Sequence, residues 1–248
     1  MPKGLFMRIA AVQCLTVTDD LDHTCDVLAR GLDWADQEAI ELILFPEAFI
    51  LGHSYDSDTI ERRAERISAG ALTVVCERLR RFRATLVVGA FERQDSAIMN
   101  NAIVIENGCV IGRYAKAYPN EPGVTAGSHF PIFERSMVRY GINICNDANY
   151  PDAARRLAEQ CASLILYPLN NMLPRRTAAR WRAKSVKNLV ARAQQTGCWV
   201  ASADVIGEAG DQLSYGCTVI VRPDGEIMGR VSEGVEGATV FDVPAATW

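Results

Sequence analysis

Stretches with the pattern of buried strands alternate with stretches with the pattern of helices along this chain of 248 residues. The strand-like stretches are short apolar runs, and the helix-like stretches repeat apolar residues every three or four positions. Such alternation is typical of an α/β domain in which helices cover a mixed sheet. Strands are predicted at residues 6–14, 42–45, 85–91, 101–105, 110–114, 138–145, 163–167 and 199–203. Helices are predicted at residues 19–37, 68–83, 151–160 and 174–196.

Turn residues divide the same pattern further. Asn107-Gly108 predicts a tight hairpin, and Pro223-Asp224-Gly225 predicts a second one near the end of the chain. The segment 117–129 is rich in proline, glycine and polar residues and is expected to be a loop. The tail 235–248 is expected to be extended and to pack elsewhere. With no linker or repeat in sight, we expect one domain over residues 1–248.

Composition excludes several classes of function. The formal net charge is −4, which differs from the basic surface of a nucleic-acid-binding protein. No apolar run reaches the roughly 18 residues of a membrane span, and the first residues lack a secretory signal pattern. The eight cysteines are dispersed without metal-ligand spacing, which predicts reduced thiols in a cytoplasmic protein. No metal site, nucleotide motif or other cofactor is expected.

One cysteine has a distinctive position. Cys145 follows the apolar run that begins at Val138, and the polar residues after it lead into a helix that begins near Pro151. A sharp change from strand to helix exposes the last side chain at the rim of a sheet, where α/β enzymes hold nucleophiles. We expect the positive end of a helix dipole there to favour a thiolate.

Two ionisable residues occupy corresponding positions. Glu47 follows the predicted strand 42–45, and Lys116 follows the predicted strand 110–114. Side chains at neighbouring strand ends can converge on one crevice. A carboxylate can take the proton of a thiol, and an ammonium can stabilise the oxyanion that forms when Cys145 attacks a carbonyl. The three residues together predict an acyl-transfer site.

The segments around these residues resemble those of the nitrilase superfamily of carbon-nitrogen hydrolases. Residues 45–52 (FPEAFILG) are similar to the superfamily's glutamate segment, and residues 114–116 (YAK) to its lysine segment. Residues 141–155 are similar to the nucleophile segment. Residues 192–193 and 216–225 are similar to the closing segments, so the resemblance extends over nearly the whole chain and follows the superfamily's order.

The resemblance implies a four-layer αββα sandwich that pairs into a homodimer or a higher homo-oligomer. It implies that Glu47 is a general base and then a general acid. Lys116 would stabilise the oxyanion together with the backbone N–H of Asn146, and Cys145 would carry the acyl group as a thioester. Glu121, five residues after Lys116, corresponds to a second glutamate that supports the lysine in this superfamily.

Four positions depart from the superfamily's usual residues: Ala115, Tyr118, Gln195 and Thr218. None of them removes the predicted triad. They leave open which branch the chain belongs to, and therefore which substrate it uses.

The predicted substrate is a small, largely neutral amide or N-carbamoyl compound. Enzymes of the superfamily that cleave N-carbamoyl amino acids hold the substrate carboxylate with arginines just after the nucleophile, and this chain has Ala148 and Asn149 there. The predicted pocket residues are Tyr118, Asn146, Asn170 and Asn171.

Other activities remain open at this point. A nitrilase would use the same triad to convert a nitrile to an acid and ammonia, although the early end of the chain at Trp248 favours an amidase. An acyltransferase would share the acyl-enzyme step, and a binding or scaffold protein could keep the fold without catalysis. A Cys–His pair with His53 or His129 is conceivable, but neither histidine lies in a recognisable motif.

Overall fold

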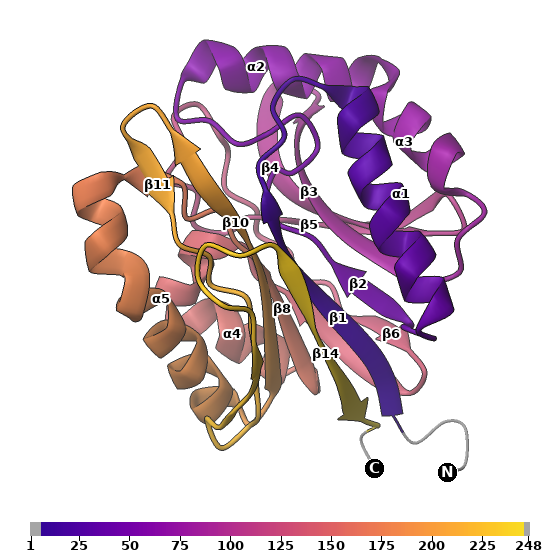
Figure 1. Cartoon of the computed structure of the whole chain (residues 1–248), viewed down its shortest axis with the longest axis vertical. Coiled ribbons are helices and arrows are strands. Elements are labelled where there is room, and N and C mark those ends of the chain that lie inside the picture. Colours follow the sequence, from indigo (N-terminus) through magenta and orange to yellow (C-terminus); the bar gives the residue numbers. More distant parts are fainter. Residues whose placement is uncertain (1–5, 246–248) are drawn as a thin grey trace.

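The computed structural model describes residues 6–245 and contains two sheets that face each other, each covered by helices on its outer side (Figure 1). The strands of the first sheet are β1 (Phe6–Leu15), β2 (Leu42–Leu44), β3 (Thr85–Gln94), β4 (Ala97–Glu106), β5 (Cys109–Ala115) and β14 (Gly237–Pro244). Their order across the sheet is β5-β4-β3-β2-β1-β14. β1, β2 and β3 run parallel, while β4 and β14 run antiparallel to their neighbours.

The second sheet has the order β6-β7-β8-β10-β12-β13, with β7, β8 and β10 parallel. Its strands are β6 (Phe133–Arg135), β7 (Val138–Ile142), β8 (Leu164–Pro168), β10 (Trp199–Ala209), β12 (Val219–Val221) and β13 (Ile227–Arg230). The short strands β9 (Leu173–Pro174) and β11 (Gln212–Ser214) extend it beside the end of β10. The two sheets join where the end of β1 pairs in parallel with β10, from Gln13 beside Asp204 to Leu15 beside Ile206.

The helices form the outer layers. They are α1 (Leu21–Gln37), α2 (Ser57–Arg66), α3 (Leu72–Leu79), α4 (Pro151–Ala158) and α5 (Arg175–Thr196). A π-helical turn, Ile67–Ala71, joins α2 to α3. Local sequence sets the ends: the Asp20 carboxylate accepts the N–H of His23 at the start of α1, and Gly197 ends α5 with a φ of +67°. Among residues 6–245, no helix is both long and apolar enough to cross a membrane.

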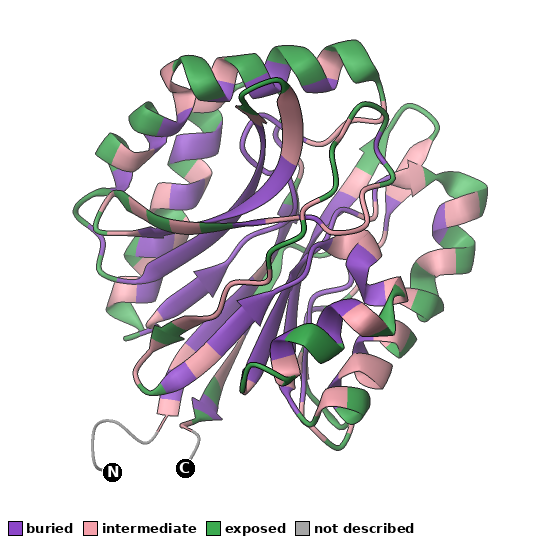
Figure 2. Cartoon of the chain, turned by 180° about the vertical axis from the view of Figure 1, so that it is seen from behind, coloured by how far each residue is buried: buried purple, intermediate pink, exposed green. Residues whose placement is uncertain are grey.

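Three apolar cores separate the four layers. Alternate strand residues point to opposite sides of a sheet, so Leu42 and Leu44 lie between the sheets while Ile43 packs toward α1. In β8, Leu164 likewise faces the first sheet and Ile165 faces the outer helices. Figure 2 shows the strands buried and the outer helix faces exposed. The predicted αββα architecture is confirmed. Each fully buried aliphatic side chain contributes about 1.5–3 kcal/mol to the free energy of folding.

Two predictions change in detail. In this region the first helix, α2, begins at Ser57, whereas the sequence predicts a helix only from residue 68. The prediction misses α2 because its buried face is narrow and includes Arg63, which pairs with Asp19. The extended tail is confirmed as β14, although it pairs with β1 of the same chain, and residues 246–248 lie outside the described part. The extent of a single domain over residues 1–248 stays a prediction.

The strand directions explain where a site can form. β2 and β5 in the first sheet and β7 and β8 in the second end at the same side of the sandwich. Loops that follow these strands therefore meet above the seam between the sheets, as ligand-binding loops do in α/β proteins.

Candidate active site

The segment that carries Glu47 leaves β2 and crosses closely over β3. A Cβ on Gly89 would lie 2.1 Å from the backbone nitrogen of Ala48, so only glycine allows this approach. The Gly89 N–H donates to the carbonyl of Pro46. The Glu47 N–H donates to the carbonyl of Leu169 at 3.1 Å, which ties the loop to the second sheet. Glu47 is thus held at the seam.

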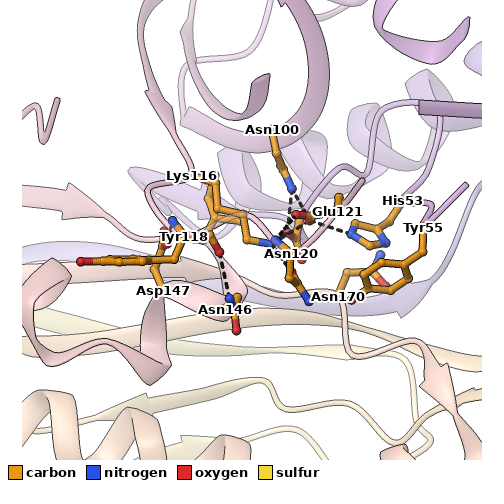
Figure 3. Close-up of polar contacts among 12 residues, drawn as sticks. His53, Tyr55, Asn100, Lys116, Tyr118, Asn120, Glu121, Asn146, Asp147 and Asn170 are labelled. Carbon is orange, nitrogen blue, oxygen red and sulfur yellow. Dashed lines mark hydrogen bonds and ion pairs between the residues drawn. The ribbon is translucent and has the colours of Figure 1, made fainter. Parts of the chain in front are cut away.

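Four buried side chains form what we call the ionic cluster: Glu47, Asn100, Lys116 and Glu121. Nζ of Lys116 lies 2.8 Å from Oε1 of Glu47 and 2.7 Å from Oε1 of Glu121. Nδ2 of Asn100 lies 2.8 Å from each of the same two oxygens (Figure 3). None of the four residues is more than 4% exposed, so the charges depend on one another rather than on water.

The cluster keeps its lysine and its second glutamate ionised. Burial disfavours the charge of Lys116, but the carboxylates of Glu47 and Glu121 more than offset this, and the pKa of Lys116 is raised well above its usual value. Burial likewise disfavours the charge of Glu121. The hydrogen bond with Nε2 of His53, at 3.0 Å, and the charge of Lys116 nevertheless hold the pKa of Glu121 well below its usual range. Lys116 is therefore an ammonium, and Glu121 is a carboxylate.

Glu47 differs from Glu121 in one respect. Its Oε1 accepts from Lys116 and Asn100, but its Oε2 is buried and has no hydrogen-bond partner among the described residues. A buried oxygen without a partner is costly, and a catalytic role is one reason for which a protein keeps such a group. Oε2 of Glu47 is the unpaired proton acceptor of the cluster.

Cys145 begins a short 3₁₀ helix, Cys145–Asn149, with a φ of +40°. Asp147 holds this turn, because its carboxylate accepts the N–H of Ile144 at 2.8 Å and the hydroxyl of Tyr114 at 2.8 Å. The same carboxylate accepts the N–H of Tyr118 at 2.8 Å, which joins the turn to the loop after Lys116. Burial raises the pKa of Asp147 to about 6.

The thiol of Cys145 is neutral at rest. Burial and the nearby charge of Glu47 raise its pKa well above the usual value, and the opposing effects of Lys116 and the backbone N–H of Asn170 are smaller. The expectation that a helix dipole favours a thiolate is therefore wrong for this protein. The turn after Cys145 is short, and burial and the charge of Glu47 both act against a thiolate. Attack by this sulfur requires a base.

A cavity of about 170 Å³ opens on one side of Cys145. It lies between the loops of the second sheet and α5, and none of its lining residues carries a formal charge. Its polar lining includes Asn146, Asn149, Asn170, Asn171 and Asn188. Its apolar lining includes Leu169, Leu173, Trp181 and Leu189. Such a cavity is suited to a small neutral ligand with hydrogen-bonding groups.

The predicted site residues lie as follows. Glu47, Lys116 and Glu121 are in direct contact, and Cys145 lies at the cavity beside them. Asn146, Asn170 and Asn171 line the cavity, as expected of pocket residues. Tyr118 does not belong to the lining; its ring stacks on Tyr150 at 3.8 Å, and its carbonyl accepts from Asn146.

Sequence reasoning missed three residues of the site, Asn100, Asp147 and Asp204, and considered His53 only as a partner of Cys145. Asn100 bridges the two glutamates, and His53 holds Glu121. Asp147 fixes the nucleophile turn, and Asp204 binds both the N–H and the side-chain amide of Asn171. A polar residue inside an otherwise apolar strand was the available signal for Asn100 and Asp204. His53 gave none, because its partner is distant in sequence.

One group of residues has the composition of a metal site. Ligand atoms of Glu47, His53 and Glu121 lie within 4.8 Å of one another. Nζ of Lys116 contacts both carboxylates at 2.7 and 2.8 Å, so an ammonium already stands where a cation would bind. The two carboxylates of this group therefore bind the ammonium of Lys116.

Comparisons with a family profile and with known proteins point to the same family. Residues 8–248 match the profile of the carbon-nitrogen hydrolase family. A nitrilase of Pyrococcus abyssi is 25% identical, over 96% of this chain and 89% of that protein. The deaminated glutathione amidase of Escherichia coli O157:H7 is 24% identical, over 92% and 87% of the two chains.

Among solved structures, an amidase from a Nesterenkonia species has a TM-score of 0.86. It is 24% identical over 98% of this chain and 92% of that chain, a similarity that supports the fold. One structure of that amidase shows covalent addition of the acetamide moiety of fluoroacetamide at its active-site cysteine, and another contains butyramide.

Proposed function

Since this chain belongs to the carbon-nitrogen hydrolase family, we propose that it is a thiol-dependent amidohydrolase acting on a small, neutral amide or N-carbamoyl compound. One observation carries the proposal. Glu47 holds a buried carboxylate oxygen without a partner, while its charge acts on the neutral thiol of Cys145. A base with free capacity beside a protonated nucleophile is the arrangement that acyl transfer requires.

In the first step the sulfur of Cys145 attacks the substrate carbonyl carbon as its proton moves to Oε2 of Glu47. Proton transfer and attack are coupled, because the thiol does not ionise by itself at neutral pH. The carbonyl oxygen takes up the electron pair and becomes an oxyanion.

Lys116 and the backbone N–H of Asn146 receive that oxyanion. The ammonium of Lys116 has three N–H donors, and Asn120 accepts through the longest of its three contacts, at 3.3 Å. That contact is the one an oxyanion can replace. The N–H of Asn146 lies in the first turn of a 3₁₀ helix, where backbone donors have no partner inside the helix.

Collapse of the tetrahedral intermediate breaks the C–N bond. Glu47 gives its proton to the nitrogen, ammonia or an amine leaves, and the acyl group stays on Cys145 as a thioester. Glu47 then takes a proton from water, whose oxygen attacks the thioester, and the acid leaves as the sulfur regains its proton. Glu121 keeps Lys116 charged throughout.

Nitrile hydrolysis is the second candidate, because one similar protein is called a nitrilase. On a nitrile, Cys145 would add to the C≡N carbon to give a thioimidate; one water would then release ammonia and leave the thioester, and a second water would release the acid. The asparagine-rich cavity favours amides, since it offers donors and acceptors to a planar carboxamide or ureido group.

Ammonia release from a panel of amides, N-carbamoyl amines and nitriles tests the proposal. We expect release from amides or carbamoyl compounds by the native protein and none by Cys145→Ala. Cys109→Ala is the matched control, because Cys109 is exposed and begins β5, at the opposite end of that strand from Lys116. Release from nitriles alone would identify a nitrilase. Specific binding of these compounds without any release by the native protein would identify a binding protein.

We also propose that the protein works in the cytoplasm as a homodimer. All eight cysteines are free thiols, which suits a reducing compartment. The mass of the native protein in solution, measured by light scattering, tests the assembly.

A further inference from the structure

Three asparagine side chains form a hydrogen-bonded series along the cavity, which we call the amide chain: Asn146, Asn149 and Asn188. Nδ2 of Asn149 donates to Oδ1 of Asn146 at 2.9 Å. Nδ2 of Asn188 donates to Oδ1 of Asn149 at 2.7 Å. All three residues line the cavity beside Cys145, so the amide chain extends from the nucleophile turn to α5.

The direction of the amide chain is fixed at its first member. Nδ2 of Asn146 donates to the backbone carbonyl of Tyr118 at 2.9 Å (Figure 3), and a carbonyl can only accept. Asn146 must therefore present its oxygen to Asn149, and Asn149 must present its oxygen to Asn188. The Tyr118 carbonyl is itself anchored, because the N–H of Tyr118 binds Asp147 and its ring stacks on Tyr150.

This direction determines what the amide chain offers at its far end. Asn188 uses its amide nitrogen on Asn149, and its Oδ1 has no hydrogen-bond partner in the part of the chain that the structure describes. The residue is half-buried at the cavity, on the face of α5 that also carries Trp181 and Ser185. A half-buried amide oxygen at a cavity wall is an acceptor that a bound ligand can use.

The cavity also restricts the charge of that donor. No aspartate or glutamate lines it, so an ammonium group at this end would lack a counter-charge. A neutral donor satisfies Asn188 without the penalty of an unpaired charge. An apolar terminus that covers Oδ1 of Asn188 would exclude water from it without replacing the hydrogen bond.

We propose that Asn188 determines specificity by selecting substrates whose acyl chain ends in a neutral hydrogen-bond donor, such as a hydroxyl or a carboxamide. The inference rests on the proposed amidohydrolase function and adds the chemistry of the acyl group to it. Oδ1 of Asn188 accepts the donor at the end of the substrate remote from the scissile bond, while the oxyanion is held near Asn146.

Matched amides of equal length test the inference. The pairs are 3-hydroxypropionamide with butyramide, 4-hydroxybutyramide with pentanamide, and 5-hydroxypentanamide with hexanamide. At the length that reaches Asn188, we expect kcat/KM to favour the hydroxyl compound about tenfold or more, since discrimination is large when a site is built to bind a polar group. In Asn188→Leu the ratio should fall to about one or below. A ratio within one variant does not depend on the fraction of folded protein.

Asn188→Asp provides a gain of function that a misfolded protein cannot imitate. Its carboxylate should shift the preference from 4-hydroxybutyramide to 4-aminobutyramide, whose ammonium then has a partner. Gln195→Leu is the control, because it removes an exposed amide from α5 outside the cavity and should keep the native ratio.

Binding to Cys145→Ala, measured by calorimetry, separates this inference from the proposed function. Tighter binding of the hydroxyl compound, lost on adding Asn188→Leu, supports the role of Asn188 even without turnover. Hydrolysis with ratios near one at every length, or a native ratio retained in Asn188→Leu, contradicts it and leaves the amidohydrolase intact. A native preference for 4-aminobutyramide contradicts the neutral donor. If the native protein and Cys145→Ala neither bind nor hydrolyse any amide or N-carbamoyl compound, both proposals are overturned.

Discussion

The two sides of the space around Cys145 are built in opposite ways. On one side, the segments that follow β2 and β5, together with Asn100 of β4, supply the ionic cluster, in which Lys116 is buried within hydrogen-bonding distance of both glutamates. On the other side, the loops of the second sheet and α5 supply a cavity without a formal charge. The nucleophile lies between them.

This contrast suggests that the ionic cluster serves the chemical steps and that the cavity selects the substrate. Charged groups held against one another in a dry site are ready for a proton and an oxyanion. Neutral amides and apolar side chains recognise shape and hydrogen bonding instead. Changes in the ionic cluster should therefore alter rate and stability, whereas changes in the cavity should alter substrate choice.

The largest effect is expected for Lys116→Met. Removing the ammonium leaves Glu47 and Glu121 facing each other without a cation. We expect amide turnover to fall about a thousandfold or more. The free energy of unfolding should fall by about 3–5 kcal/mol, the cost of breaking a buried ion pair. Steady-state kinetics and urea unfolding measure the two effects.

Adding Glu121→Gln to Lys116→Met is the control for this prediction. It removes one of the two uncompensated charges and should restore part of the stability without restoring turnover. Native stability in Lys116→Met would show that the ionic cluster is not the coupled unit described above.

The next effect concerns the one acid behind the neutral cavity. Burial is the main cause that raises the pKa of Asp204 to about 7. The folded protein therefore binds a proton there at a pH where the unfolded chain has released it, so stability falls as pH rises through about 7. Relative to Asp204→Asn, the native protein should lose about 2.5 kcal/mol between pH 5 and pH 8. Urea unfolding of both proteins across this range measures the difference, and a constant difference would refute the buried acid.

A smaller effect is expected for Asn100→Leu. The two carboxylates lose the amide that both accept from, while Lys116 still joins them. We expect about 1–2 kcal/mol of lost stability and a lower kcat. Asn101→Leu is a matched comparison on the same strand, since Asn101 binds Glu92 and not the ionic cluster. Equal losses of kcat in the two variants would argue against a specific role for Asn100.

The smallest effect belongs to the cavity. Trp181 lines the cavity on the α5 side and makes no hydrogen bond to the ionic cluster. Trp181→Leu should therefore remove a contact that stabilises the bound substrate and the transition state equally. We expect KM to rise about fivefold with kcat nearly unchanged. A fall in kcat with KM unchanged would place Trp181 on the reactive side instead.

The sequence predicts the fold well because strand and helix periods are written in local apolar patterns, as in 42–45 and 174–196. It fails for α2, whose buried face includes Arg63. It also predicts that Glu47 and Lys116 meet, because their strands end at one edge of the sheet, whereas Glu121 is expected only from the resemblance to the nitrilase superfamily.

Other features of the site depend on tertiary contacts that no local pattern records. The raised pKa of Cys145 arises from burial beside Glu47, nearly a hundred positions away. Asn188 reaches the cavity only because α5 packs over the loop of Asn149. His53 meets Glu121 from a separate loop, 68 positions earlier in the chain.

The thioester on Cys145 is the central claim, and peptide mapping after rapid acid quenching tests it most directly. The native protein, mixed with an amide that it hydrolyses, should gain the mass of the acyl group on the peptide that contains Cys145. Cys145→Ala should gain none and release no ammonia. An acyl group on another residue, or undiminished amide turnover by Cys145→Ala, would contradict the account.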